Sequence, residues 1–324
     1  MIKIQSPIDS KCALCGNNAH LYRYHSGQFM CNNCFIKSIE KIINKTISKY
    51  NMLDPKDSIV VAFSGGKDSA ALLYNLIQIQ QNTYNSKDLI ALTIDEGIKG
   101  YRDEAISVAK EFCKKFEIEH HIISFKEEFG FSLNEIVNHK IHDNDYLYAC
   151  NYCATIRRRL INDSAKKLGG SKVALGHNLT DFAETFLMNI LYKRIQLIGN
   201  QYPFRKEPKF LQNFFLKKIF PMMRIPEDEI QLYMDLKKIQ YYPNHCPYRE
   251  KDPILRKRVL KFIQSTKKMS PEIEFNLLNS FLELSELINQ KNEIKSYGIC
   301  RKCGYPSGKK EICRYCALKN IMEN

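Results

Sequence analysis

The residues with the clearest chemistry are Ser64-Gly65-Gly66-Lys67-Asp68-Ser69. The two glycines let the backbone approach an anion closely, and successive N–H groups at the start of a helix supply donors and a favourable dipole. Lys67 adds a positive charge, and the hydroxyls of Ser64 and Ser69 add donors. Because the lysine directly follows two adjacent glycines, this is not the G-x4-G-K-[ST] loop. The segment predicts a phosphate-binding loop of another kind, and the alternative is a Gly-Gly turn that binds nothing.

Ten of the twelve cysteines form five C-x2-C pairs, a pattern that indicates metal ligation in a reducing compartment. Near each end of the chain, two pairs have the spacing of four thiolates that converge on one structural Zn²⁺. The alternative is two unrelated pairs of thiols at each end. The first set is Cys12, Cys15, Cys31 and Cys34, and the second is Cys300, Cys303, Cys313 and Cys316.

Three further thiols, those of Cys150, Cys153 and Cys246, belong to neither set. Three cysteines around an iron–sulfur cube leave one iron without a protein ligand, and that open position could hold a sulfide for transfer. A Cys150–Cys153 redox pair, or a thiolate that carries persulfide near a helix N-terminus and arginines, explains the same residues. The spacing alone does not decide between these chemistries. Cys113 lies on the apolar face of a predicted helix and is interpreted as a core residue.

Charged residues near these motifs supply candidates for acid, base and phosphate chemistry. The run from Gly176 to Glu184 follows a predicted strand and contains Asp181, an acidic residue that can hold Mg²⁺ or orient an attacking group. His177 in the same run contacts a nucleotide or only packs. Arg157, Arg158 and Arg159 lie about 100° apart around a helix, so they cannot share one role. One is expected to face phosphates while another meets RNA or solvent.

The elements that position these residues alternate between strands and helices. Apolar runs at 58–63, 89–94, 118–125 and 172–175 predict strands, and helical spacing is found at 70–77 and 102–116. This alternation predicts an α/β fold with a doubly wound, mostly parallel sheet, whose ligand crevice lies at the carboxyl ends of the strands. From Pro226 onward the chain is expected to be mostly helical. We divide it into an N-terminal zinc ribbon (1–45), a catalytic domain (46–265), and a helical segment with a C-terminal ribbon (266–324).

The charge balance favours a large polyanionic partner. The chain has 49 Lys and Arg against 35 Asp and Glu, a net charge of +14, which suits RNA, although solubility alone is the alternative. The stretch from Tyr192 to Lys218 interleaves aromatics with cations, a composition suited to stacking on bases or to internal packing. No apolar run is long enough to cross a membrane, and the N-terminal residues lack a signal-peptide pattern. We therefore expect a cytoplasmic protein with no membrane partner.

Together these residues resemble the tRNA 2-thiouridine synthetases, PP-loop ATP pyrophosphatases that carry a zinc ribbon at each end. The resemblance covers nearly the whole chain. The Asp-Glu-Gly-Ile-x-Gly-Tyr-Arg-Asp run is more similar to the branch that acts on the anticodon wobble uridine than to the branch that acts on the T-loop thymidine. The matching segments are Phe63 to Ser69, Ile94 to Asp103, Cys150-x-x-Cys153 with the arginines after it, and Cys246-Pro247-Tyr248.

The resemblance implies an ATP-dependent tRNA sulfurtransferase that adenylates the carbon-2 oxygen of a uridine and replaces it with sulfur. It implies a [4Fe-4S] cluster on Cys150, Cys153 and Cys246, phosphate stabilisation by Lys67 and Arg157, and proton or Mg²⁺ handling by Asp181. The sulfur donor, free sulfide or a thiocarboxylated ubiquitin-like carrier protein, stays open, and so does the homodimer common in that family. The implied ATP contacts are Ala62, Phe63, Ser64, Asp68, Ile94, Arg157 and Gly176.

Two residues depart from the family pattern. Thr180 stands where the family has the first of two aspartates, and Ala154 stands where it has a glycine. The loss of a carboxylate weakens the case for Mg²⁺ coordination by that pair, while Asp181 keeps its position. The remaining alternatives are thiolation of the T-loop position, a PP-loop amide-forming synthetase that acts on a small molecule, and a non-catalytic RNA-binding module.

Overall fold

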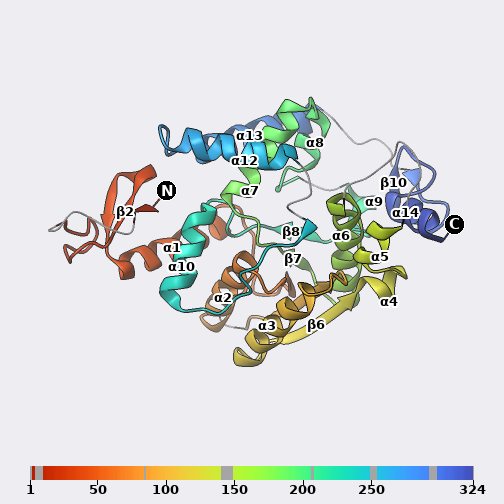
Figure 1. Cartoon of the computed structure of the whole chain (residues 1–324), viewed down its shortest axis with the longest axis horizontal. Coiled ribbons are helices and arrows are strands. Elements are labelled where there is room, and N and C mark those ends of the chain that lie inside the picture. The colour runs from red at the N-terminus through yellow and green to blue at the C-terminus, as the bar shows by residue number, and fades with distance from the viewer. Residues whose placement is uncertain are drawn as a thin grey trace.

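The computed structural model describes residues 2–3, 10–83, 85–139, 149–205, 208–248, 254–291 and 298–323. At its centre is a five-stranded sheet in the order β6-β5-β4-β7-β8, with all neighbouring strands parallel (Figure 1). The strand order reverses at β4, which places the ligand crevice of a doubly wound sheet at the carboxyl end of that strand. The predicted fold class is therefore confirmed. The strands are β4 (Ile59–Ala62), β5 (Ile90–Asp95), β6 (Glu119–Ser124), β7 (Lys172–Ala174) and β8 (Lys217–Ile219).

The sheet is buried on both faces because successive side chains of each strand point to opposite sides. In β4, Val61 belongs to one hydrophobic core and Val60 to the other. The first core is covered by helices α1 (Asn32–Lys49), α2 (Lys67–Gln81), α3 (Arg102–Lys115) and α10 (Glu227–Lys237). The second is covered by α4 (Phe125–Phe129), α5 (Leu133–Asn138), α6 (Ala149–Lys167) and α14 (Arg314–Glu323).

Four further helices form a layer beside the carboxyl ends of the strands, across the top of Figure 1. These helices have a small hydrophobic core, in which Ala183 packs against Val259 and Ile263. The four helices are α7 (Leu179–Leu191), α8 (Ile195–Asn200), α12 (Ile254–Lys267) and α13 (Ile273–Lys291), and the short α9 (Lys209–Gln212) precedes β8.

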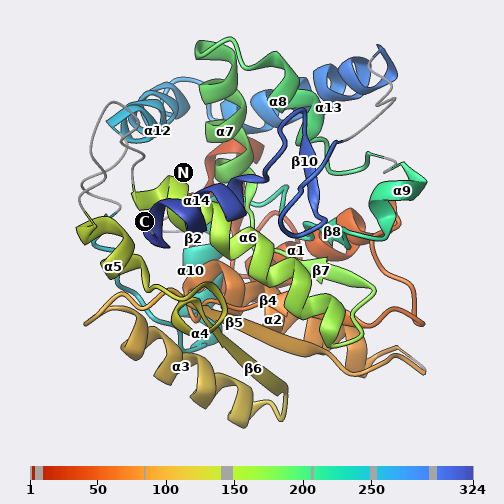
Figure 2. The ribbon, with the colours of Figure 1, turned by 90° about the vertical axis from the view of Figure 1, so that its right-hand side faces the viewer.

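The two cysteine-rich ribbons lie at opposite ends of the molecule (Figure 1). The N-terminal ribbon is an antiparallel sheet of β1 (Ile2–Lys3), β2 (Leu21–Arg23) and β3 (Gln28–Met30), with a 3-10 turn η1 (Tyr24–Ser26). The C-terminal ribbon pairs β9 (Gly298–Ile299) with β10 (Pro306–Gly308) and ends in α14, which packs on α6 (Figure 2).

Each ribbon is attached to the main body by buried or stacked charges. In the first ribbon, Arg23 and His25 lie 3.0 and 2.7 Å from the buried carboxylate of Glu229 in α10. In the second, the guanidinium of Arg159 in α6 stacks 3.3 Å above the ring of Tyr305. Helix α1 starts inside the first ribbon, continues past residue 45 and enters the main core, so no linker separates ribbon from body.

The basic stretch from Tyr192 to Lys218 has two different parts. Phe214 and Phe215 pack edge-on against Tyr305, and the segment after them forms β8. Packing, the alternative interpretation, is therefore what these two rings do. Tyr192 stays exposed under the guanidinium of Arg194, and Lys206 lies outside the described residues. None of the helices in the described part of the chain is long and apolar enough to span a bilayer.

Candidate active site

The predicted phosphate loop joins β4 to α2 at the carboxyl edge of the sheet. The Ser64 N–H donates to the Ser69 hydroxyl at 3.1 Å, and the Ser69 hydroxyl lies 2.9 Å from the Gly66 carbonyl oxygen, which closes the loop. No described side chain caps the N-terminus of α2 at Gly66. The first N–H groups of this helix are therefore available to an anion. Ala62 ends β4, and Phe63 is buried against Phe112.

Gly65 lets the loop lie close to the neighbouring helix α3. Its φ is +82°, and a Cβ atom there would lie 2.4 Å from the carbonyl oxygen of Ala105. Neither the backbone conformation nor the space accepts a side chain without a shift of α3.

We therefore expect Gly65→Ala to destabilise the fold more than Gly100→Ala does. Gly100 also has a positive φ, +69°, but has open space around it. Both variants incur the cost of a left-handed alanine, about 1–2 kcal/mol, and Gly65→Ala adds roughly 1–3 kcal/mol of overpacking. Urea unfolding of the two variants measures this difference. Equal losses of unfolding free energy would contradict the close contact with Ala105.

Lys67 is held by carboxylates at the start of α2. Its ammonium lies 3.3 Å from Asp68 and 3.1 Å from Glu227 of α10, and its side chain is only 13% exposed. Burial alone would lower the pKa of Lys67, but these two carboxylates raise it, so the lysine stays charged. Burial raises the pKa of Asp68, with Lys67 opposing and Asp181 and Glu227 adding to the rise.

The loop after β7 contacts the start of α2 directly. A Cβ on Gly176 would lie 3.1 Å from the backbone of Asp68 and Ser69, so only glycine fits without displacing the phosphate loop. Asn178 caps α7 in a capping box with Asp181, and its amide donates to the Asp68 carboxylate at 3.2 Å. The predicted residues Gly176 and Asp181 therefore lie beside the predicted loop.

Thr180, the departure from the family pattern, has a structural role. Its hydroxyl donates to the buried carboxylate of Glu274 in α13 at 2.6 Å and accepts the backbone N–H of Glu227 at 3.2 Å. The Glu274 carboxylate is paired in turn with the buried Lys267 of α12 at 2.6 Å. An aspartate at position 180 would face Glu274, and two carboxylates at that distance would repel each other.

A buried pair of charges connects the phosphate loop with helix α6. Arg102 donates to the carbonyl oxygens of Ser64 and Ile94, both at 2.8 Å, and contacts Glu96 at 2.8 Å. The other carboxylate oxygen of Glu96 lies 3.4 Å from Arg157 of α6, whose side chain is 48% exposed. Two of the predicted ATP-contact residues are thus held by their backbone oxygens, and a third is aligned through Glu96.

Cys150, Cys246 and Arg157 all act electrostatically on Cys153. Burial raises the pKa of Cys153 to about 12, Arg157 opposes this rise, and the charges of Glu96, Cys246 and Cys150 add to it. Cys153 and Cys246 both pack against the second core. Among the described residues, the three sulfurs do not all lie within 4.8 Å of one another. They suit a cluster in which each thiolate binds a different iron better than a single ion.

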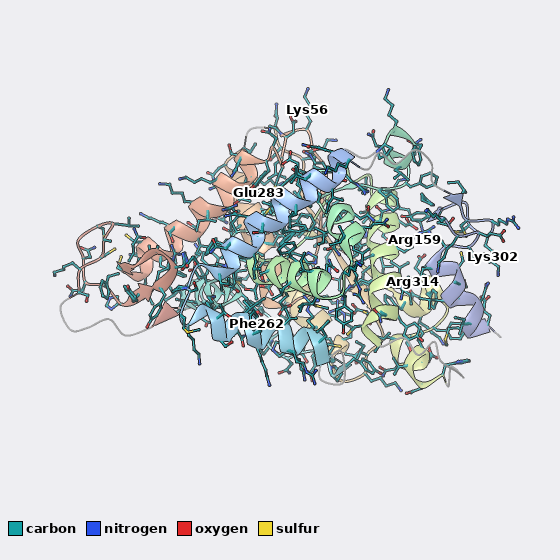
Figure 3. All side chains as sticks on the ribbon, turned by 90° about the horizontal axis from the view of Figure 1, so that it is seen from above. Lys56, Arg159, Phe262, Glu283, Lys302 and Arg314 are labelled. Atoms are coloured by element: carbon teal, nitrogen blue, oxygen red, sulfur yellow. The ribbon has the colours of Figure 1, made fainter. Side chains whose placement is uncertain are left out.

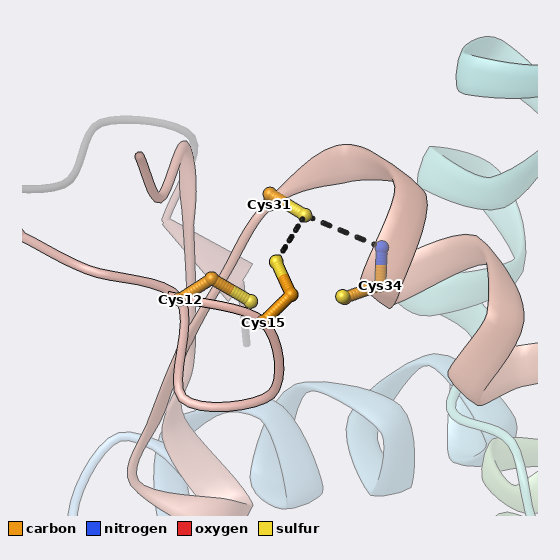
Figure 4. A group of neighbouring side chains, drawn as sticks. All are labelled: Cys12, Cys15, Cys31 and Cys34. Carbon is orange, nitrogen blue, oxygen red and sulfur yellow. Dashed lines mark hydrogen bonds between the residues drawn. The ribbon is translucent and has the colours of Figure 1, made fainter. Parts of the chain in front are cut away.

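The two predicted sets of four cysteines do converge. Within each set, all four sulfurs lie within 4.8 Å of one another, as tetrahedral ligation of one ion requires (Figure 4 shows the first set). Burial would raise the pKa of Cys12, but backbone N–H groups of Cys31, Leu14 and Cys15 lower it to about 6. Backbone N–H groups act likewise on Cys300. In each site, backbone N–H groups thus favour the thiolate form of one cysteine, which is the form that binds metal.

Arg158 and Arg159 have surroundings that differ from those of Arg157, as predicted for three consecutive residues of a helix. Arg159 pairs with Asp163 and stacks on Tyr305, and its Nη1 lies 3.8 Å from the sulfur of Cys303. The pKa of Arg158 is lowered by burial and by Arg157, Arg314 and Arg256. His177 packs edge-on against Phe182 and Phe220. Cys113 is buried, in agreement with its predicted place in the core.

Sequence reasoning did not single out Glu96, Arg102, Glu227 or Arg256. Arg256 of α12 bridges Asp181 at 3.4 Å and Glu184 at 2.8 Å. The signal for Glu96 and Arg102 was their place in the run from Ile94 to Asp103, where these two opposite charges flank a turn with two glycines. Nothing in their local sequence signals the positions of Glu227 and Arg256.

Comparisons with known proteins agree with this geometry. The family model described as a PP-loop domain matches residues 33–262. A probable sulfurtransferase of Methanocaldococcus jannaschii is 37% identical over 310 residues, which cover 94% of this chain and 85% of that protein. The cytoplasmic tRNA 2-thiolation protein 1 of Drosophila ananassae is 31% identical over 315 residues, covering 96% and 87%.

A solved structure extends the agreement to the whole fold. The U34-tRNA thiolase NcsA from Methanococcus maripaludis, with its [4Fe-4S] cluster, matches with a TM-score of 0.80 and 30% identity, covering 97% of this chain and 96% of that one. The chain therefore belongs to the PP-loop family and, within it, to the group of tRNA 2-thiolation enzymes.

Proposed function

We propose that this enzyme uses ATP to replace the carbon-2 oxygen of a uridine in tRNA with sulfur, and that the uridine is the anticodon wobble position. The wobble assignment is supported by the similar solved structure, which is a U34-tRNA thiolase, and by the run from Ile94 to Asp103. We also propose the cytoplasm as its place of action, on the strength of the name of its fly relative.

A single line of contacts carries this proposal. It starts at the Ser64 carbonyl in the phosphate loop, passes through Arg102 and Glu96, and reaches Arg157 beside Cys153. This chain of contacts therefore connects a loop that suits ATP with thiols that suit a sulfur source. An amide-forming synthetase has no use for these thiols, and an RNA-binding module has no use for the loop.

The first half of the reaction is activation of the uridine. The carbon-2 oxygen attacks the α-phosphorus of ATP, the bond to the β-phosphate oxygen breaks, and pyrophosphate leaves. Lys67 and the N–H groups that begin α2 stabilise the negative charge on the phosphates. Asp181, at the start of α7, would hold Mg²⁺ or accept a proton.

The second half exchanges oxygen for sulfur. When bound, a [4Fe-4S] cluster held by Cys150, Cys153 and Cys246 would supply sulfide through its iron that lacks a protein ligand. The sulfur bonds to carbon 2, and the carbon–oxygen bond breaks so that the oxygen leaves with AMP. Arg157 lies next to Cys153 and stabilises the charge on the departing phosphate.

We further propose Zn²⁺ in both ribbons, where it would be structural. Four cysteines already complete a tetrahedral site, so no position is left for a substrate. Protein purified without oxygen should contain two zinc and four iron atoms per chain.

Pyrophosphate release tests the proposed function. Release of pyrophosphate from ATP should require tRNA. The product tRNA should contain 2-thiouridine at position 34 when sulfide or a thiocarboxylated carrier protein is supplied. Release that needs ammonia and a small molecule instead of tRNA would favour an amide-forming synthetase. Sulfur found in the T-loop would contradict the wobble assignment, and the two donors compared in parallel decide the source of the sulfur.

A further inference from the structure

Helix α12 is amphipathic and has no acidic residue in its fourteen positions. Val259 and Ile263 pack against α7, which fixes the inner side of the helix. Residues three and four positions apart share a face of an α-helix, so Arg258, Lys261 and Phe262 lie together on the side away from these two.

The two cations on the inner side are neutralised. Arg256 is paired with Asp181 and Glu184 of α7, and Lys267 with Asp228 and Glu274. These pairs attach the helix to the active-site layer, and their four carboxylates leave no excess positive charge on this side.

The outer side of the helix carries exposed cations. Lys257, Arg258 and Lys261 are exposed. Of these, Arg258 and Lys261 make no ion pair with any described residue. Phe262 is 60% exposed between them, on the outer edge of the molecule in Figure 3. An exposed aromatic ring flanked by cations suits RNA, because the ring stacks on a base while the cations contact phosphates.

We propose that the outer face of α12, defined by Arg258, Lys261 and Phe262, docks the tRNA that enters the active site. This inference rests on the proposed function and names a surface for its substrate. Because Arg256 contacts Asp181, the helix begins at the active site, and Phe262 lies about 9 Å farther along it at 1.5 Å per residue. A polynucleotide with one uridine at the site can therefore extend along α12.

The test measures tRNA affinity across a range of salt concentrations. Each phosphate contact contributes roughly 0.7–0.9 to the slope of log affinity against log salt, so the double variant Arg258→Gln with Lys261→Gln should lower that slope by about 1 to 2. Phe262→Leu keeps an apolar side chain but loses the ring, so it should weaken binding roughly 5- to 150-fold at every salt concentration.

Lys56→Gln is the matched control. Lys56 is exposed in the turn before β4, at the edge of the sheet away from the phosphate loop, and Figure 3 places it on the opposite side of the molecule from Phe262. Its substitution removes the same charge and should leave the slope unchanged. ATP affinity and metal content should be the same in all variants, since none of these residues touches the candidate active site.

The outcomes separate the surface from the function. If the α12 variants bind tRNA like Lys56→Gln while the wild type still binds and thiolates it, the docking surface is wrong and the proposed function stands. If the wild type neither binds nor thiolates tRNA, both are overturned. The expected slope change together with the loss from Phe262→Leu would support the surface.

Discussion

Cys246→Ala is expected to give a protein that binds ATP with unchanged affinity but forms no detectable 2-thiouridine. Cys246 is far from Cys150 and Cys153 in the sequence, yet in the structure both Cys150 and Cys246 raise the pKa of Cys153. Without it, the proposed cluster keeps only two cysteine ligands and should be lost. The iron content and visible absorption of anaerobically prepared protein, an ATP-binding titration and nucleoside analysis measure the three consequences.

The matched control is Cys113→Ala, which removes a thiol from the buried face of α3. This variant should keep its iron and its thiolation activity, with a loss of unfolding free energy on the order of 1 kcal/mol for the small cavity. Full thiolation activity in Cys246→Ala would remove the three thiols from the mechanism.

The second large effect is expected for Lys67→Gln. The ammonium of Lys67 is largely buried at the start of α2, where ATP phosphates would meet it in a setting of low dielectric constant. Removal of one preorganised charge of this kind typically lowers a rate about 10²- to 10³-fold. We expect that decrease in tRNA-dependent pyrophosphate release, with unchanged iron and zinc content.

Glu227→Gln provides the comparison for Lys67→Gln, because it removes a partner of the lysine and leaves the lysine in place. Its effect on pyrophosphate release should be well below that of Lys67→Gln. If the two variants lose the same activity, the role of Lys67 is to hold α10 in position and not to stabilise phosphate.

The sequence predicted those features that depend on local pattern. The strand before Ser64, the glycine pair and the helix that begins at Lys67 follow from residue order within a short window, and the structure contains all three. The two ribbons were equally predictable because paired cysteines leave few other uses for their thiols, and both sets of sulfurs converge.

What the sequence did not predict depends on contacts between distant segments. Strand β8 has three residues, of which only Ile219 is buried, so it has too little apolar pattern to stand out from a basic stretch. Glu227 and Arg256 meet Lys67 and Asp181 only because α10 and α12 pack beside the sheet. Their own neighbours in the chain carry no sign of these contacts. From the sequence, Thr180 is only the loss of a carboxylate. In the structure its hydroxyl donates to Glu274, which is 94 positions away in the chain.

Helix α6 also bears on the order of events in catalysis. Cys153 and Arg157 are one turn apart on an unbroken helix, so their backbones are offset by about 6 Å along its axis whatever else in the protein moves. A uridine activated beside the guanidinium would thus already be next to its sulfur source. Both bond-forming events can accordingly take place without a change in the spacing of these two residues.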